Sequence, residues 1–482
     1  MQDLKEEKTM KSVEVKKNIQ YRIVKYAILS RVLVILLQYM ANLLITDHDA
    51  NVFVSPSEET FTTIDRVIHH LFGGFARWDA QYFLHIAKYG YTFENTTAFF
   101  PLYPLILRYI SISLLYVYNF MNLSSMLLLT SVVFNTIIFV KTALILFEIT
   151  AFFENPKIVY TAIMVFCFNP ASIFFSAPYS ECLYAYLTFK SIQCCLRYVR
   201  MYSRIRFTYV NSSSLKCIFY ISLSACARSN GVLNLGFFLY SYAFLVVQNL
   251  FRLKNTKFAK YIFVIISLLF LMFYISAMIL PFALIQVFDF INYCRTFESN
   301  VPDFLKDFAK QNDFVLPGTF SIHQQSWCND NIPLAYAYVQ KHYWNVGFLK
   351  YFQFNQIPNF LLATPVVYIT IRNSLKYFKL NNPFLMHLGL FRDLNQIKLI
   401  DMEIKPSLKF ACVVHVLLLT LFCVFCTHVQ VTTRIIFSAS PCIYWFCASY
   451  YDHIRSKNLI FLYCMFYFVT GTIMFSNFLP WT

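Results

Sequence analysis

The chain has 482 residues, of which 58% are hydrophobic and 13% charged, and its mean hydropathy is +0.53. A soluble protein carries about 25% charged residues, so this composition excludes an ordinary soluble protein. The formal net charge of +16 does not indicate a nucleic-acid partner, because the basic residues gather in short stretches between apolar runs, a pattern that sets membrane topology. We therefore expect an all-α polytopic membrane protein.

The chain begins with a charged stretch, residues 1–22, which we interpret as a cytoplasmic basic tail. Residues 23–45 read as an uncleaved first span, because no short apolar segment with a small-residue cleavage site precedes them. The remainder, 23–482, reads as a single polytopic domain. Runs of about 20 apolar residues can cross the bilayer, and we expect about eleven spans, near 23–45, 124–150, 157–175, 181–199, 215–229, 232–250, 261–287, 356–371, 408–427, 433–450 and 459–479.

The distribution of Lys and Arg predicts which connections face which side. Basic connections are expected to stay in the cytoplasm, and here they lie at 1–22, 197–216, 252–260, 372–409 and 451–458. The other connections and the C-terminus then face the lumen. Two of these luminal connections are long, namely the 46–123 loop and the 288–356 loop, and we expect the second to form a partly helical cap.

One apolar segment, 104–122, fits either a span or a surface helix. Counting it as a span would place the basic 197–216 connection in the lumen, against the positive-inside rule. We therefore predict a luminal or interfacial helix there, with the second span at about 124–150.

The first luminal loop carries the most informative residue, Asp79. Trp78, Tyr82, Ile86 and Tyr89 recur beside it at near-helical spacing, which predicts an amphipathic helix at the membrane surface with its aromatic rings at headgroup depth. Asp79 would then project where a lipid-linked sugar presents its head, in the place of a general base. The simpler interpretation is that Asp79 pairs with Arg77 or sits in a helix first turn, and the other bases available in this loop are His85 and Glu94.

From about residue 70 to 450 the chain carries a collinear set of distinctive sequence blocks. The first is Trp78-Asp79-Ala80-Gln81-Tyr82 with Ala98-Phe99-Phe100-Pro101. The others are Tyr179-Ser180-Glu181, Arg228-Ser229-Asn230-Gly231, Tyr343-Trp344-Asn345-Val346-Gly347, Pro358-Asn359-Phe360 and His428-Val429-Gln430-Val431 with Thr433-Arg434. Together these blocks resemble the PIG-V family. Arg77, His85 and Pro178 depart from the family pattern, and none of them is in the Trp78-Asp79 pair.

The resemblance implies a GT-C-type glycosyltransferase, multi-pass in the endoplasmic reticulum membrane, with its active site in the lumen and amphipathic luminal helices after the first span. It implies transfer of the second mannose of the GPI anchor, through an α-1,6 bond, from dolichyl-phosphate-mannose to the mannosyl-glucosaminyl-phosphatidylinositol intermediate. The expected partners are these two lipids and the surrounding membrane lipids, and no metal or other cofactor is expected.

Transfer from a β-linked phosphate donor to an α product needs one inverting displacement and one base, for which Asp79 is our candidate. The leaving phosphate needs cationic donors, and Arg228, His428 and Arg434 fit that need, although interfacial arginines often only snorkel. Glu181 opens a predicted span, where it either contacts a sugar hydroxyl or simply suits the helix dipole. The remaining residues predicted to bind substrate are Trp78, Gln81, Asn230, Trp344, Asn345 and Gln430.

Three further features stay open at this point. Cys294 and Cys328 lie in the predicted luminal cap, an oxidising environment, and can form a disulfide. Sequons at Asn95 and Asn122 lie on the predicted luminal side, but matches of this length arise by chance. Two alternative functions remain: another dolichyl-phosphate-sugar transferase with a different acceptor, or a polytopic lipid or solute transporter or scramblase, against which stands the gathering of the polar residues at one membrane face.

Overall fold

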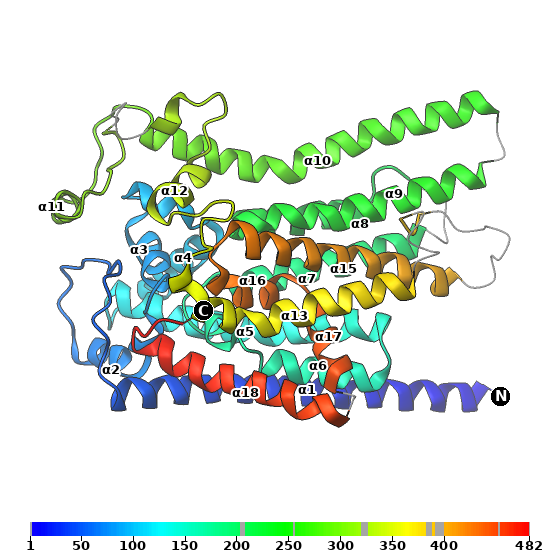
Figure 1. Ribbon diagram of the computed structural model, residues 1–482, viewed down its shortest axis with the longest axis horizontal. Helices are drawn as coiled ribbons and strands as arrows, with labels where there is room; N and C mark the ends of the chain where they lie inside the picture. Colours follow the sequence, from blue (N-terminus) through cyan, green and yellow to red (C-terminus); the bar gives the residue numbers. More distant parts are fainter. Residues whose placement is uncertain are drawn as a thin grey trace.

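The computed structural model describes residues 2–202, 208–253, 256–319, 326–381, 388–390, 400–451 and 454–481, and within them all regular secondary structure is helical. The long helices run side by side along the bundle (Figure 1). The described helices outside the two long connections are α1 (Gln2–Leu44), α5 (Leu123–Phe153), α6 (Pro156–Cys167), α7 (Glu181–Tyr202), α8 (Ser212–Ala227), α9 (Leu235–Arg252), α10 (Lys257–Tyr293), α13 (Ile357–Leu380), α15 (Ile400–Cys426), α16 (Thr432–Ala439), α17 (Cys442–Tyr451) and α18 (Ile454–Ser476), of which α16 and α17 are short.

The membrane character expected from composition is confirmed. In the described part of the chain, six helical segments are long and apolar enough to span a bilayer: Lys17–Leu44, Leu123–Phe153, Ser229–Arg252, Lys257–Tyr293, Leu408–Cys426 and Leu459–Ser476. The other expected spans correspond to α6, α7, α8, α13 and the pair α16–α17, which are shorter or less apolar. The protein is therefore multi-pass, and the count of eleven stays a prediction.

Two expected spans have different boundaries, and proline explains both. The span expected at 157–175 is α6, which ends at Cys167, just before Asn169-Pro170. The span expected at 433–450 is interrupted at Ser440-Pro441, where Ser440 is extended (φ −141°, ψ 132°). Proline lacks an N–H and disfavours the helical conformation in the residue before it, so each helix stops there.

Both long connections lie at one end of the bundle, which we call the cap end (Figure 1). The first forms α2 (Thr63–Phe72), the short 3₁₀ helices η1 (Gly73–Phe75) and η2 (Glu94–Ala98), α3 (Ala80–Tyr89) and α4 (Leu102–Val117). The second forms α11 (Asp303–Gln311), η5 (Ser326–Asn329), α12 (Ala335–Tyr343) and η6 (Phe354–Gln356). The chain starts at the opposite end and finishes at the cap end, where the His48 N–H donates to the Asn477 carbonyl (2.9 Å). A chain that starts and finishes at opposite ends of the bundle must cross it an odd number of times, which agrees with the topology expected from the charge pattern.

The ambiguous segment 104–122 does not cross the bundle. Its helix, α4, begins beside Phe100, which packs against Tyr336 of α12, and it leads to Asn122, whose N–H donates to the Asp65 carboxylate of α2 (3.0 Å). Both contacts lie at the cap end. Arg108 of α4 donates to the carbonyls of Ala87 and Lys88 (3.2 and 3.0 Å) and so satisfies acceptors at the C-terminus of α3. The segment therefore starts and ends at the cap end, and its position as a luminal or interfacial helix stays a prediction.

The expectation that α3 turns its aromatic residues toward lipid headgroups is wrong. Tyr82 is sandwiched between the rings of Phe53 and Phe99, with centroids 4.4 and 4.5 Å away, and Ile86 is buried. The near-helical spacing therefore reports protein packing, because the rest of the two long connections covers this face of the helix.

A buried arginine in α1 holds the turn that leads into α7. Arg31 is fully buried and donates to the carbonyls of Ser172 and Cys167 and to the hydroxyls of Ser172 and Ser176, at 2.8 to 3.3 Å. A cation within a span is costly unless its donors are satisfied. These bonds fasten the 3₁₀ turn η3 (Ser172–Phe175) to α1 and thereby position Tyr179 and Glu181 at the cap end.

Candidate active site

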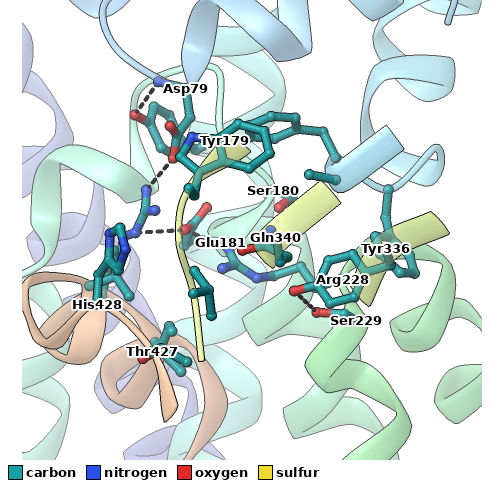
Figure 2. Close-up of a pocket in the computed structure, with 18 of the residues that line it drawn as sticks. Asp79, Tyr179, Ser180, Glu181, Arg228, Ser229, Tyr336, Gln340, Thr427 and His428 are labelled. Carbon is teal, nitrogen blue, oxygen red and sulfur yellow. Dashed lines mark hydrogen bonds and ion pairs between the residues drawn. The ribbon is translucent and has the colours of Figure 1, made fainter. Parts of the chain in front are cut away.

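A cavity of about 230 Å³ opens at the cap end, between the ends of the bundle helices and α12 (Figure 2). Its charged residues come from segments far apart in the chain. Asp79 precedes α3, Glu181 begins α7, Arg228 follows α8, and Arg434 lies in α16. All four were predicted from the sequence to act in the reaction, and the structure brings them together around one space.

The backbone before α3 aims Asp79 into this cavity. Trp78 has a left-handed conformation (φ +56°), which costs a non-glycine residue roughly 1–3 kcal/mol and is found mainly where function requires it. Asp79 takes the N-cap position of α3, but its carboxylate makes no capping hydrogen bond. Its backbone N–H instead donates to the Tyr179 hydroxyl (3.0 Å), so the side chain is free to turn toward the cavity.

The four charged side chains alternate in sign. Arg434 Nη1 donates to Asp79 Oδ2 (2.8 Å), Arg434 Nε lies 3.8 Å from Glu181 Oε1, and Arg228 pairs closely with the same Glu181 oxygen. The simpler pairing of Asp79 with Arg77 is not formed, because Arg77 binds Asp47 (2.8 Å). The cluster holds two positive and two negative groups, so it is close to neutral before a ligand enters.

The two carboxylates of the cluster differ in access. The Asp79 side chain is 30% exposed, whereas that of Glu181 is 1% exposed and lies between two guanidinium groups. Asp79 can therefore meet a substrate hydroxyl directly. Glu181 is placed to orient the two arginines and not to exchange protons with a substrate.

His428 and Gln430 line the same cavity, but His428 is not a cationic donor at neutral pH. Burial lowers the pKa of His428 below its usual 6.5, so the ring is mostly neutral. It stacks on Tyr351 (centroids 4.7 Å apart), whose hydroxyl donates to Gln430 (3.2 Å). Arg228 and Arg434 are then the cations available to a leaving phosphate, and we expect the neutral imidazole of His428 to act as a hydrogen-bonding group.

Four residues predicted to bind substrate lie outside the cavity lining. Trp78 packs near Phe478. Gln81 donates to the Ala76 carbonyl (2.6 Å) and accepts from the Ser55 N–H (3.1 Å). The Asn345 side chain accepts from Lys350 (3.1 Å), and the Asn230 carbonyl accepts from Tyr184. These residues shape the loops around the site, whereas Trp344 does line the cavity.

The other two candidate bases in the first loop are occupied elsewhere. Both nitrogens of the buried His85 are bonded, to Ser55 (2.8 Å) and Thr92 (2.7 Å), and burial lowers its pKa to about 3. Glu94 accepts from the Trp327 indole N–H and the Tyr343 hydroxyl (2.9 Å each), and burial raises its pKa. Neither residue lines the cavity.

Glu94 belongs to an assembly that joins the two long connections, which we call the loop anchor and define as Glu94, Trp327, Tyr343 and the Cys294–Cys328 disulfide. The disulfide links the end of α10 to η5, beside Trp327. The loop anchor holds α12 over the cavity, and the cysteine pair considered from the sequence is joined in the structure.

Several cavity residues were not assigned a role from the sequence. They are Tyr179, Ser180, Ser229, Tyr336, Gln340 and Thr427, among others. Tyr336 and Gln340 are spaced by four residues, with Trp344 four further on, a helical spacing that marks one face of α12. That signal was present, but spacing does not say which face meets the site.

Proteins with known names resemble this chain over most of its length. The family described as Mannosyltransferase (PIG-V) matches residues 19–482. "GPI mannosyltransferase 2" of Drosophila pseudoobscura pseudoobscura is 33% identical, over 96% of this chain and 99% of that protein. "GPI alpha-1,6-mannosyltransferase 2" of Homo sapiens is 32% identical, over 88% of this chain and 82% of that protein. Among solved structures, the Archaeoglobus fulgidus oligosaccharyltransferase aligns with a TM-score of 0.41 and 10% identity, over 94% of this chain and 53% of that one.

Proposed function

Because this chain belongs to the PIG-V mannosyltransferase family, we propose that it transfers the second mannose of the GPI anchor from dolichyl-phosphate-mannose, forming an α-1,6 bond. The family resemblance drawn from the sequence blocks is confirmed across residues 19–482, and the chain is a glycosyltransferase. The acceptor is the mannosyl-glucosaminyl-phosphatidylinositol intermediate. The observation that carries the proposal is an accessible carboxylate, Asp79, held against Arg434 in a cavity that contains a second arginine.

The reaction is a single inverting displacement. Asp79 takes the proton from the acceptor 6-hydroxyl as that oxygen attacks C1 of the donor mannose. The bond between C1 and the phosphate oxygen breaks, and dolichyl phosphate leaves with the electron pair. Inversion at C1 converts the β-linked donor to the α-linked product. A phosphate leaving group is a weak base, so no general acid is required.

Arg434 has two tasks in this scheme. Before the donor binds, it neutralises Asp79 through the 2.8 Å bond. The incoming phosphodiester offers Arg434 another anionic acceptor that gains further negative charge as dolichyl phosphate leaves, and charge-assisted bonds between arginine and phosphate are strong. Glu181, 3.8 Å from Arg434 Nε, keeps the guanidinium in place as its other nitrogens turn from Asp79 to the phosphate. Asp79 then becomes available as a base when the donor is present.

Arg228 supplies the second positive charge for the leaving group. Its guanidinium, paired with Glu181, lines the same cavity and stabilises the negative charge that develops as the phosphate departs. With two guanidinium groups in reach, the proposed reaction needs no metal ion and no other cofactor.

We propose a GT-C-type fold with about eleven crossings and an endoplasmic reticulum location, with the cavity in the lumen. The basic stretches between the apolar runs support this orientation. The 46–123 loop carries the catalytic carboxylate and the 288–356 loop forms the cap. The cap end, which carries Asp79, lies opposite the start of α1, in keeping with a cytoplasmic N-terminal tail.

The test uses microsomes from cells that lack the second GPI mannosyltransferase and express this chain, supplied with dolichyl-phosphate-mannose and the one-mannose GPI intermediate. The expected result is a two-mannose glycolipid whose new bond is cleaved by an α-1,6-specific mannosidase, together with restored surface GPI-anchored proteins. Mannose transfer to another acceptor would favour a different dolichyl-phosphate-dependent transferase. Normal expression with no transfer at all would contradict the proposal.

A further inference from the structure

The cavity has two walls of different chemistry. The wall built from the bundle and the catalytic loop carries the four ionised groups described above. The wall built from the cap carries Tyr336, Gln340 and Trp344, which are all neutral and lie along one face of α12 and its C-terminal end. Figure 2 shows Tyr336 and Gln340 across the cavity from Asp79, with Arg228 and Glu181 beside Gln340. A ligand between the walls meets charge on one side and an amide with aromatic rings on the other.

Partly buried hydrogen bonds hold α12 at both ends. At its start, the Tyr336 N–H donates to Gln286 Oε1 of α10 (3.2 Å), and the Tyr336 hydroxyl accepts from Ser229 (2.7 Å). At its end, Tyr343 donates to Glu94 in the loop anchor (2.9 Å). The cavity face of α12 is therefore set in place before any substrate arrives, as precise recognition requires.

Gln340 lies at the middle of this face and has spare hydrogen-bonding capacity. Its side-chain amide makes no hydrogen bond to any residue that the structure describes, while it lines the cavity. A primary amide offers two N–H donors and an acceptor oxygen, which matches neighbouring hydroxyls on a sugar ring. One turn further, Trp344 rests against Tyr82 and Phe99 (centroids 6.1 and 6.0 Å) and offers a fixed aromatic surface for the apolar side of a sugar.

The position of the two substrates decides which sugar lies here. The donor mannose is joined to a phosphate, so it is drawn to Arg228 and Arg434 on the charged wall. The acceptor must bring its reactive hydroxyl to Asp79, and its ring then lies toward the opposite wall. We propose that the face of α12 formed by Tyr336, Gln340 and Trp344 is the subsite for the terminal neutral hexose of the acceptor, with Gln340 bonding its hydroxyls. This inference rests on the proposed function.

The test separates the two Michaelis constants in the microsomal transfer assay. Gln340→Ala removes the amide, and Gln340→Met removes it while keeping the shape of the side chain. Both variants are expected to raise KM for the acceptor glycolipid roughly tenfold, the worth of about one hydrogen bond, and to leave KM for dolichyl-phosphate-mannose unchanged. Gln340→Asn, which restores an amide on a shorter arm, recovers part of the loss. The matched control is Lys341→Ala, at an exposed neighbouring residue on α12, which changes neither constant.

A purely structural role for Gln340 would lower the thermal stability of the protein in detergent, and this is not expected for the Met variant. If the donor KM rises while the acceptor KM stays constant, the face holds the donor sugar and the inference is overturned. It is also overturned if neither constant changes. Failure of the proposed function looks different, since the unmodified chain would then make no two-mannose product.

Discussion

Asp79 and Glu94 belong to the same loop, yet Asp79 in the cavity and Glu94 in the loop anchor have opposite surroundings. The cavity leaves the Asp79 carboxylate 30% exposed and sets one guanidinium against it. The loop anchor buries Glu94 and fills both of its oxygens with bonds from Trp327 and Tyr343. Both are carboxylates among aromatic residues, and only one has room for a substrate.

The difference identifies the reactive group by its surroundings. A carboxylate that accepts two directed bonds from buried donors is committed to holding its neighbours, and opening it would leave those donors unpaired. A carboxylate whose partner is a cation is released when that cation binds a substrate phosphate instead. We therefore expect substitutions in the cavity to reduce catalysis and substitutions in the loop anchor to reduce stability.

The largest effect is expected from Asp79→Asn. The amide cannot take up the acceptor proton, so the turnover number for mannose transfer should fall by about 10³-fold, with normal amounts of protein in the membrane. The assay is transfer to the one-mannose GPI intermediate in microsomes. The comparison variant is Glu94→Gln, which should keep most of its activity, and full activity of the Asp79→Asn variant would remove Asp79 as the base.

The second-largest loss of activity is expected from Arg434→Gln. Loss of one donor to developing charge costs about 10²-fold in rate, and the variant should also bind the donor lipid more weakly. Arg434→Lys keeps the charge without the planar pair of donors and should recover only part of the activity. A variant with unchanged donor KM and turnover would break the link between Arg434 and the phosphate.

Glu94→Ala tests the contribution of the loop anchor to stability. It strands the Trp327 indole N–H and the Tyr343 hydroxyl, at about 1–3 kcal/mol for each buried donor, so the melting temperature in detergent should drop clearly. Glu94→Gln, which can still pair with both groups, should lose much less. If the Glu94→Ala variant were as stable as the unmodified chain but inactive, Glu94 would belong with the catalytic residues.

The smallest effect concerns pH and His85, which ties α3 to the rest of the first loop. Its pKa is about 3 in the folded protein and about 6.5 when unfolded, so the unfolded state binds the proton first as the pH falls. The stability that the neutral, buried His85 ring contributes is fully present above about pH 6.5 and is lost as the pH falls toward the folded-state pKa. Acidification from about pH 7 to about pH 5 should therefore lower the free energy of unfolding by about 2 kcal/mol. Unfolding in detergent at the two pH values measures it, and His85→Gln should remove that part of the pH dependence.

Much of the site could be predicted before the fold was known. Asp79, Glu181, Arg228, His428 and Arg434 were selected from motifs and from the charge pattern, and all of them line the cavity. The charge pattern succeeds because each basic connection fixes a membrane side, and the sides alternate along the chain. The same alternation predicts that the 104–122 segment is a helix that does not cross.

The charge pattern does not predict which side chains line the cavity, because that depends on how the helices pack within the plane of the membrane. Trp78, Gln81 and Asn345 lie within two positions of cavity residues in the chain, but none of the three lines the cavity. Conversely, Tyr336 and Gln340 carried no motif that drew attention, and the loop anchor turns them inward. A helical spacing defines a face, but neighbours distant in the chain decide what that face meets.

The sequence by itself determined a multi-pass helical membrane protein, its family, the end of the bundle that carries the chemistry, and Asp79 as the residue to suspect. Only the tertiary structure decided that Asp79 pairs with Arg434, in α16 near the end of the chain, and not with Arg77, two positions away. Composition and charge order a chain across the bilayer, since transfer free energy acts on each segment separately. Which helix ends then come together depends on lateral packing, where buried bonds such as those of Arg31 and Glu94 select one arrangement.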